Sequence, residues 1–360
     1  MNKNNYVAIM AGGIGSRFWP VSRKGKPKQF LDILNTGQTL LQSTYARFAA
    51  FIPEENIFIV TAMEYESLVK EQLPNLDAHN ILCEPSRKNT APCIAYISYR
   101  LMQQNPEANL ICAPADHLIL DGAAFEEVCL KALDFTENIK ALVTLGIEPH
   151  SPNTGYGYIQ FEPMAVSPDV YKVKTFTEKP NLELAKTFVA SGEFLWNAGI
   201  FAWKVKNIVA AFEKLLPEIH EVFDAGKKQF GTDQERETIE HIYPQVVNIS
   251  IDYGIMEKAD NVYVIPASFG WSDLGTWASA YDTLEKDYFG NAVGGDNVFV
   301  VDAINNMVHA SSEKLVVLQG IENLIVVDTD DVLLICKKEN EQDIKEYVSE
   351  IKRKQGEKFL

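Results

Sequence analysis

Acidic residues are absent from the first 31 positions of the chain, although acids outnumber bases in the sequence as a whole. Residues 1–31 contain no Asp or Glu, whereas the complete sequence has 49 of them against 33 Lys and Arg, a formal net charge of −16. A strongly acidic surface repels nucleic acid and anionic membranes. We therefore expect neither as a partner, and we interpret the basic cluster as a local site for an anionic ligand.

Cysteines and long apolar runs are also scarce. The five cysteines are odd in number and form no C-x-x-C pair, which argues against a disulfide framework and against a structural zinc site. No stretch reaches the roughly 18 to 20 apolar residues of a membrane helix. The first apolar run, residues 6–11, is too short for the core of a signal peptide. These absences predict a cytoplasmic protein.

The hydrophobic content, 46% of 360 residues, is enough for one large domain and a smaller one. In the first third of the chain, short β-branched runs alternate with amphipathic stretches, with helices expected at 39–50, 63–72 and 91–103. Such alternation predicts a mostly parallel sheet wrapped by helices. Residues 155–203 have the pattern of strands broken by turns, and we expect them as an antiparallel addition at one edge of the sheet.

The last 75 residues have a different pattern. Five short apolar runs follow one another at fairly even intervals, and a charged helix is expected from about Asn340. This predicts a small all-β domain closed by a helix, so that residues 1–285 form a catalytic domain and residues 286–360 a second domain. Short apolar strands leave edges that a second subunit can cover, which favours a homodimer.

A glycine-rich loop, GGIGSR, follows the first expected strand, where backbone amides can approach phosphates. The dinucleotide motif G-x-G-x-x-G fails because its third glycine would fall on Phe18, and the nucleotide P-loop fails because its second glycine would fall on Arg17 or Phe18. What remains is G-G-x-G-x-R, with Lys28 eleven residues after the arginine. A guanidinium and an ammonium beside such a loop can hold a polyphosphate. The alternative is a tight turn with a solvated basic face.

The sequence AGGIGSRFWPVSRKGKPKQF at 11–30 resembles the corresponding loop of sugar-nucleotide pyrophosphorylases, and of mannose-1-phosphate guanylyltransferases in particular. Further motifs of that family follow in its order over about the first 280 residues. They are EPSRKNTAP at 84–92, PADH at 114–117, GYGYI at 155–159, FTEKP at 176–180, WNAGIF at 196–201, IDYGIMEK at 251–258 and WSDLGTW at 271–277.

The resemblance implies a Rossmann-like nucleotidyltransferase domain with a mixed, mostly parallel sheet, followed by a small left-handed β-helix-like domain. It also implies transfer of GMP from GTP to α-D-mannose 1-phosphate, giving GDP-mannose and pyrophosphate, by metal-assisted in-line attack without a covalent intermediate. Two alternatives stay open. One is the same chemistry with another nucleoside triphosphate and hexose 1-phosphate, and the other is a non-catalytic regulatory subunit that binds sugar nucleotides.

Three cations are the catalytic residues that the resemblance implies. Arg17 would hold the β- and γ-phosphates, Lys28 would lie near the α-phosphate, and Lys179 would bind the sugar phosphate, while Arg23 would support the leaving group. Without the family context, Lys179 has the alternative of a plain turn lysine. The nucleotide-binding residues implied by the resemblance are Ala11, Gly12, Gly13, Gly15, Ser16, Arg17, Lys28, Glu84, Asn89 and Thr90.

The resemblance further implies Mg²⁺, with Mn²⁺ as a substitute, held by Asp116 and Asp273, because the negative charges brought together would otherwise repel. The alternatives are a helix cap for Asp116 and an Asx-turn for Asp273. Glu84 can accept from the N1–H and N2–H₂ groups of guanine, with a solvent-facing loop acid as its alternative. The implied sugar-binding residues are Gly157, Glu178, Lys179, Asn197 and Glu257.

Overall fold

The computed structural model describes residues 1–310 and 313–360, and their contacts divide the chain into two compact units. The first unit comprises residues 1–12, 44–115 and 119–271, and the second comprises residues 13–43, 116–118 and 272–360. The glycine-rich loop therefore packs mainly with C-terminal residues. The domain boundary expected near residue 286 stays a prediction.

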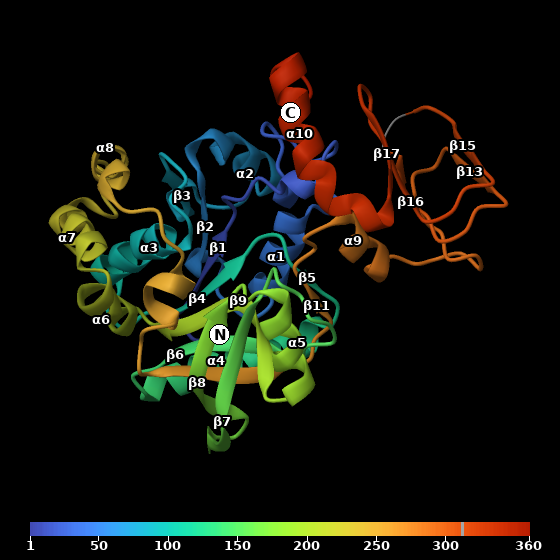
Figure 1. Ribbon diagram of the computed structural model, residues 1–360. Helices are drawn as coiled ribbons and strands as arrows, with labels where there is room; N and C mark the ends of the chain where they lie inside the picture. Colours follow the sequence, from blue (N-terminus) through green and yellow to red (C-terminus); the bar gives the residue numbers. More distant parts are fainter. Residues whose placement is uncertain (311–312) are drawn as a thin grey trace. The chain divides into compact units, whose positions relative to one another are not determined.

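The first unit contains one sheet of nine strands. These are β1 (Asn5–Met10), β2 (Ile57–Ala62), β3 (Ile81–Glu84), β4 (Asn109–Pro114), β6 (Leu142–Ile147), β7 (Gly157–Ser167), β8 (Val170–Glu178), β9 (Phe194–Lys204) and β10 (Val262–Ala267). Their order in the sheet is β3–β2–β1–β4–β9–β6–β10–β8–β7 (Figure 1). Within it β8 and β9 run against the other strands. The predicted mixed, mostly parallel sheet is confirmed.

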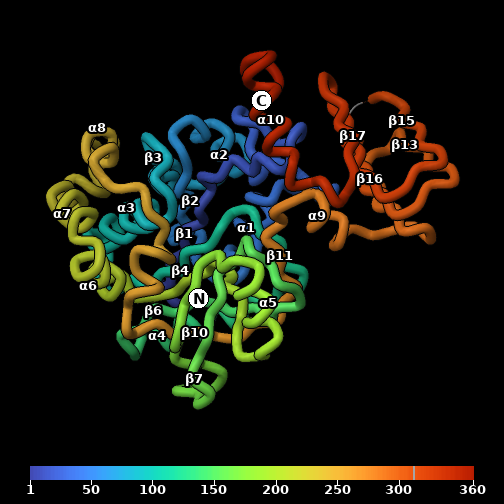
Figure 2. The backbone as a smooth tube through the Cα atoms, viewed as in Figure 1, coloured from blue at the N-terminus to red at the C-terminus, as the bar shows by residue number. Residues whose placement is uncertain are grey.

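The antiparallel part of the sheet is formed by β7, β8 and β9. The hairpin of β7 and β8 lies at the edge, as predicted, and can be followed at the bottom of Figures 1 and 2. The prediction was wrong for β9, which lies between β4 and β6. Consecutive residues of β9, Phe201, Ala202 and Trp203, are all buried. Because this strand is apolar on both faces, it suits the interior of the sheet.

Helices cover both faces of this sheet. Before residue 271 they are α1 (Leu40–Ala49), α2 (Glu66–Gln72), α3 (Thr90–Gln104), α4 (Gly122–Asn138), α5 (Leu182–Ser191), α6 (Val205–Leu215), α7 (Pro217–Gly226) and α8 (Glu235–Ile242). Leu110 and Cys112 of β4 share a core with α3 and α6, whereas Ile111 lies on the opposite face against Cys129 of α4. This alternation is the period of a strand buried on both faces. The helices predicted between residues 39 and 103 are confirmed.

The second unit contains a ladder of short strands. They are β12 (Ala292–Gly294), β13 (Val298–Val301), β14 (Met307–Ala310), β15 (Val316–Gln319), β16 (Leu324–Asp328) and β17 (Leu333–Lys337). β12, β14 and β16 stack in parallel, as do β13 and β15. Asn306 Nδ2 donates to Asn291 Oδ1 (2.9 Å) of the preceding coil, and both side chains are buried. Successive coils stacked in this way give a β-helix-like fold, as predicted.

Two helices complete the second unit. They are α9 (Trp277–Thr283) and α10 (Ile344–Gln355). The terminal helix begins slightly later than predicted, because residues Lys338–Asp343 form 3₁₀ turns before it. Phe18 and Trp19 pack with Trp277 and Ile344 in one apolar cluster. Two-residue strands, β5 (Leu118–Ile119) and β11 (Trp271–Ser272), occur where the chain passes from one unit to the other.

Within residues 1–310 and 313–360, no helix combines the length and the apolar character that crossing a membrane requires.

Candidate active site

The glycine-rich loop starts in the first unit, directly after β1. Ala11 donates its backbone N–H to the carbonyl of Val60 (2.7 Å) and so extends the pairing of β1 with β2. Gly12 lies at the carboxyl end of β1, beside Glu84 at the end of β3. An added Cβ at Gly12 would lie 3.4 Å from Glu84 Oε2. The backbone of Gly12 thus lies close to this carboxylate at the end of the sheet.

From Gly13 onward the loop belongs to the second unit. Gly15 has φ of +64°, and any side chain there would collide with that of Lys28. The position therefore requires glycine for its conformation and for the close approach. Ser22 Oγ donates to the carbonyl of Ile14 (2.8 Å), which fixes the turn that leads into the single 3₁₀ turn Ser16–Phe18.

Lys28 is buried and uses all three of its N–H donors on protein groups. Its Nζ lies 2.9 Å from Asp116 Oδ2 and donates to the backbone carbonyls of Asp273 and Leu274, each at 2.9 Å. Leu274 has φ of +42°, a left-handed conformation that is costly for leucine and needs support from its surroundings. Through these contacts Lys28 connects the loop with Asp116 and with residues 273–274, the two segments that contain the predicted metal ligands.

The two predicted metal ligands occupy different settings. Burial alone would raise the pKa of Asp116, but the charges of Lys28 and His117 hold that pKa below its ordinary value. Asp116 therefore stays a carboxylate at neutral pH. Asp273 Oδ1 accepts the backbone N–H of Gly275 (3.0 Å), so the Asx-turn considered as its alternative role is present. This turn leaves the other oxygen of Asp273 outside that hydrogen bond.

The two arginines of the loop have different surroundings. Arg17 Nε is buried without a hydrogen-bond partner in the described part of the chain. Arg17 also affects Lys345 in the C-terminal segment electrostatically. The pKa of Lys345 is lowered first by burial and then by the charge of Arg17. Arg23 instead forms a two-point ion pair with Asp331 and donates from Nε to the carbonyl of Pro20 (2.8 Å). Arg23 therefore braces the loop, whereas Arg17 keeps a guanidinium donor that no described residue uses.

Whether these residues suit a magnesium ion depends on their donor chemistry. Within residues 1–310 and 313–360, no group of three or more His, Cys, Asp or Glu side chains could hold a metal ion by itself. Asp116 and Asp273, in the two segments that Lys28 contacts, offer hard oxygen donors. Mg²⁺ in phosphate-transfer sites is bound by one or two carboxylates together with substrate phosphates and water. The donor set fits an ion that is shared with a phosphate.

Glu84 ends β3 and is buried, so the alternative of a solvent-facing loop acid is wrong. Its Oε1 accepts a hydrogen bond from the hydroxyl of Tyr243. Burial raises the pKa of Glu84 to about 7, against the opposing effects of Tyr243 and Arg87. A carboxyl group with this pKa changes near neutral pH between a protonated form, which can donate a hydrogen bond, and a carboxylate, which only accepts.

Asn89 and Thr90 begin α3, as expected. Asn89 has φ of +69° and caps the helix by accepting the backbone N–H of Thr90 (2.9 Å). Thr90 Oγ1 accepts the N–H of Ile251 (2.9 Å). Both side chains thus have structural partners, and no described residue accepts the hydroxyl hydrogen of Thr90.

The predicted sugar-binding residues come together at the end of β8. An added Cβ at Gly157 would lie 2.5 Å from Glu178 Oε2 and 3.2 Å from the Cβ of Asn197, so a larger residue there would displace the Glu178 carboxylate. Lys179 pairs with Glu178, whose carboxylate raises the pKa of Lys179 above its ordinary value although burial alone would lower it. Glu257 accepts the backbone N–H of Glu178 (3.0 Å), so it orients the end of the strand.

Asp252 belongs to this group and was missed in the sequence analysis. It starts a π-helical turn (Asp252–Met256), and its Oδ1 accepts a hydrogen bond from Asn197 Nδ2 (2.9 Å). A short π-helical turn often marks a functional site. The available signal was an acid inside the apolar motif IDYGIMEK, of which only Glu257 had been selected.

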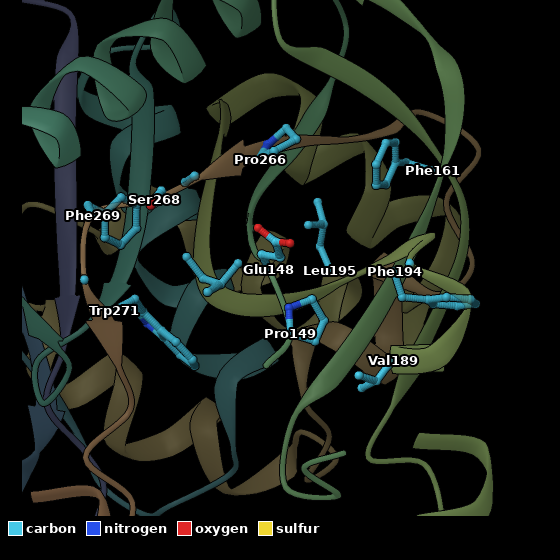
Figure 3. A pocket seen from close by; sticks show the side chains of 14 residues that line it. Glu148, Pro149, Phe161, Val189, Phe194, Leu195, Pro266, Ser268, Phe269 and Trp271 are labelled. Atoms are coloured by element: carbon cyan, nitrogen blue, oxygen red, sulfur yellow. The ribbon is translucent and has the colours of Figure 1, made fainter. Parts of the chain in front are cut away.

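A cavity of about 560 Å³ lies elsewhere in the first unit, between the ends of β6, β9 and β10 (Figure 3). Phe194, Leu195, Pro266 and Trp271 are among its fourteen lining residues, and Glu148 is its acidic side chain. None of the lining residues is a predicted site residue. The cavity is therefore lined by other residues than those of the groups described above.

The model of the nucleotidyl transferase family matches residues 6–288. The chain belongs to this family. A second family model, that of the MannoseP isomerase/GMP-like beta-helix domain, matches residues 296–351 and agrees with the stacked coils of the second unit. The chain is thus an enzyme of the nucleotidyltransferase type, as predicted.

Relatives within this family resemble the chain over almost its whole length. Mannose-1-phosphate guanylyltransferase RfbM of Salmonella typhimurium is 37% identical, covering 96% of this chain and 72% of its own length. A mannose-1-phosphate guanylyltransferase of Escherichia coli is 36% identical, covering 98% and 74%. A solved structure described as mannose-1-phosphate geranyltransferase from Thermus thermophilus is 30% identical, with a TM-score of 0.87, covering 97% of this chain and 99% of that one. The resemblance inferred from the motifs is confirmed.

Proposed function

We propose that this protein transfers GMP from GTP to α-D-mannose 1-phosphate, giving GDP-mannose and pyrophosphate. The observation that carries the proposal is the likeness to relatives named mannose-1-phosphate guanylyltransferase over more than nine-tenths of the chain. The site chemistry is consistent with it, because the loop supplies cations for charged phosphates, and Asp116 and Asp273 offer carboxylates for a metal ion.

The glycine-rich loop and the segments that Lys28 contacts supply the groups for the triphosphate. Arg17 binds the β- and γ-phosphates through its guanidinium group. Lys28 reaches the α-phosphate by exchanging one of its present acceptors, such as the carbonyl of Leu274, for a phosphate oxygen. Asp116 and Asp273 hold Mg²⁺ or Mn²⁺, which when bound neutralises charge on the phosphates.

Residues at the ends of β3 and β8 supply the groups for the base and the sugar. Glu84 accepts hydrogen bonds from guanine in its carboxylate form, with the backbone at Asn89 and Thr90 beside it. Lys179 binds the phosphate of the sugar and exchanges Glu178 for it. Glu178 and Asn197 then contact hexose hydroxyls. In the structure Glu257 acts on the backbone of Glu178, and we therefore assign it a positioning role.

The reaction needs no covalent enzyme intermediate. An oxygen of the sugar phosphate attacks the α-phosphorus of GTP, a new P–O bond forms in line with the breaking bond, and pyrophosphate leaves with the bonding electron pair. No group of the chain has to accept a proton in this step. Catalysis then rests on positioning and on stabilisation of charge by the cations of the loop.

Pyrophosphate release tests the proposal. The purified protein is incubated with Mg²⁺ and each of GTP, ATP, UTP, CTP and dTTP, crossed with mannose, glucose and other hexose 1-phosphates. Release confined to GTP with mannose 1-phosphate supports the assignment. Release with a different pair keeps the mechanism and overturns the substrates. If folded protein binds GDP-mannose but releases no pyrophosphate with any pair, the regulatory-subunit alternative replaces the proposal.

The remaining predictions concern assembly and location. We propose a homodimer, because outward-facing apolar residues of the stacked coils, Phe299 and Val317, form a register pair and are both exposed. Light scattering coupled to gel filtration should give a mass near 81 kDa, twice the 40.4 kDa of one chain, and a monomer at micromolar concentration would contradict it. The cytoplasmic location stays a prediction.

A further inference from the structure

The sugar-binding group contains a chain of three hydrogen-bonded side chains that runs from the sheet to Asp252. Thr144 of β6 is buried, and its hydroxyl donates to Asn197 Oδ1 (2.8 Å), which also accepts the N–H of Gly199 (3.1 Å). The amide oxygen of Asn197 is thereby saturated. Its Nδ2 is then fixed as the donor side, with one hydrogen on Asp252 Oδ1 and one that no described residue accepts.

The charges around this chain oppose the binding of an anionic substrate. Three acids, Glu178, Asp252 and Glu257, lie near the cation Lys179, which already pairs with Glu178. A sugar 1-phosphate carries up to two negative charges near neutral pH. When that phosphate binds Lys179, the lysine no longer neutralises the carboxylates around it. These three acids then repel the ligand unless one of them is protonated.

We propose that Asp252 is a further specificity-determining residue of the sugar site, and that it takes up one proton when the sugar 1-phosphate binds. The inference rests on the proposed function, since it assigns a role in recognising that substrate. Protonated Asp252 keeps accepting from Asn197 through Oδ1 and presents an O–H donor, while the free hydrogen of Asn197 Nδ2 offers a second donor. The hexose hydroxyls thus meet two oriented donors at this point.

The surroundings of Asp252 favour the neutral acid. Burial, and then the charge of Glu178, raise the pKa of Asp252 to about 7, although Lys179 and the hydrogen bond from Asn197 act in the opposite direction. Tyr253, next to Asp252, donates from its hydroxyl to the carbonyl of Glu178.

Helix α6, which also packs against the π-helical turn, offers Asp252 little compensation within the described residues. Leu216, which follows α6, packs against Gly254 of the turn, and the side chain of Lys214 in α6 is engaged with Asp260 at 3.6 Å. The nearby positive charge therefore comes from Lys179.

Substrate binding changes this balance. A phosphate that displaces Glu178 from Lys179 adds negative charge beside Asp252 and takes up the charge of the lysine. Because like charges disfavour the ionised form, binding should pull a proton onto Asp252.

The test compares the wild type with Asp252→Asn, which has the shape of the protonated acid, and with Asp260→Asn, a matched surface control on the same segment. The kcat/KM for mannose 1-phosphate is measured with saturating GTP and Mg²⁺ from pH 6 to 9. Ionisation of the substrate phosphate affects all three proteins equally, so the ratio of each variant to wild type isolates the contribution of Asp252. A thermal melt of each protein verifies folding.

We expect Asp252→Asn to be within about threefold of wild type at pH 6. Above pH 7 the ratio of variant to wild type should rise, up to the tenfold per pH unit that one required proton allows. Asp260→Asn should keep a ratio near 1 throughout. A ratio for Asp252→Asn that does not change with pH would overturn the inference while leaving the proposed function intact. Wild-type protein that is folded yet inactive with GTP and mannose 1-phosphate would overturn both.

Discussion

Replacing Lys28 by Met tests whether this lysine organises the candidate site or only contacts substrate. Met keeps the length and the apolar stem of the side chain and removes the ammonium, whose Nζ lies 5.7 Å from the centroid of the Phe18 ring. The substitution leaves Asp116 without its cation and two backbone carbonyls of the WSDLG loop without their donor. We expect both the stability of the second unit and the response to Mg²⁺ to change.

The magnitude of the stability change follows from the geometry. Breaking a buried ion pair by removing one partner costs about 3–5 kcal/mol when the remaining charge stays dry. The side chain of Asp116 is 30% exposed, compared with 5% for Lys28, so water can solvate part of the remaining charge. The two carbonyls add a loss of roughly 1–3 kcal/mol each if they stay buried and unpaired, and less if the loop relaxes toward solvent. We expect the free energy of unfolding to fall by about 2–4 kcal/mol.

The pH dependence of the unfolding free energy provides an independent test of the Lys28–Asp116 ion pair. The pKa of Asp116 is held below its ordinary value, mainly by Lys28 acting against burial. For an acid with a lowered folded-state pKa, the stabilisation is present above about pH 4 and is lost as the pH falls through the lowered value. The difference in unfolding free energy between wild type and Lys28→Met should therefore shrink below pH 4.

Urea denaturation followed by tryptophan fluorescence measures this difference, and pyrophosphate release at increasing Mg²⁺ measures the functional part. Lys26→Met, an exposed lysine of the same loop, is the matched control. We expect Lys28→Met to need more Mg²⁺ for half-maximal rate and to have a lower rate at saturation. If its unfolding free energy stays within about 0.5 kcal/mol of the wild type, the organising role is refuted and only a substrate contact remains.

Three further predictions concern other parts of the site. The pKa of Glu84 is raised to about 7, so steady-state kinetics should show that KM for GTP increases as the pH falls from 8 to 6. In Glu84→Gln, KM for GTP should be higher than in the wild type and independent of pH. Gly157→Ala places a methyl group 2.5 Å from Glu178 Oε2, so KM for mannose 1-phosphate should rise at least tenfold with little change for GTP; equal effects on both substrates would contradict this. Arg23 and Asp331 are partly exposed, so a double-mutant cycle on urea unfolding should give a coupling of about 1 kcal/mol or less.

Much of the fold could be predicted from periodicity, because strands and helices bury different sequence patterns. The stacked coils of the second unit follow from evenly spaced apolar runs, and each of the five expected strands is present. The position of β9 could not be predicted from alternation. Its order in the sheet depends on which neighbours bury Phe201 and Trp203, which is a property of the assembled core. The grouping of residues 13–43 with C-terminal residues is likewise a matter of long-range packing.

The candidate site shows the same limit at the level of single side chains. Sequence motifs identify candidate residues by their type and position, and in this way they identified Lys28, Glu84 and Asn197. They do not supply partners, so the three acceptors of Lys28 and the pairing of Asn197 with Asp252 had to come from the structure.

Those partners change the chemical meaning of the residues. A lysine with every donor engaged must exchange a protein acceptor for a phosphate. In the proposed sugar site, an acid held beside a carboxylate gains a proton when the anionic substrate binds. On both proposals, binding replaces an interaction within the protein, at Lys28 for the nucleotide and at Lys179 for the sugar phosphate, so affinity depends on what each ligand must displace as well as on what it contacts.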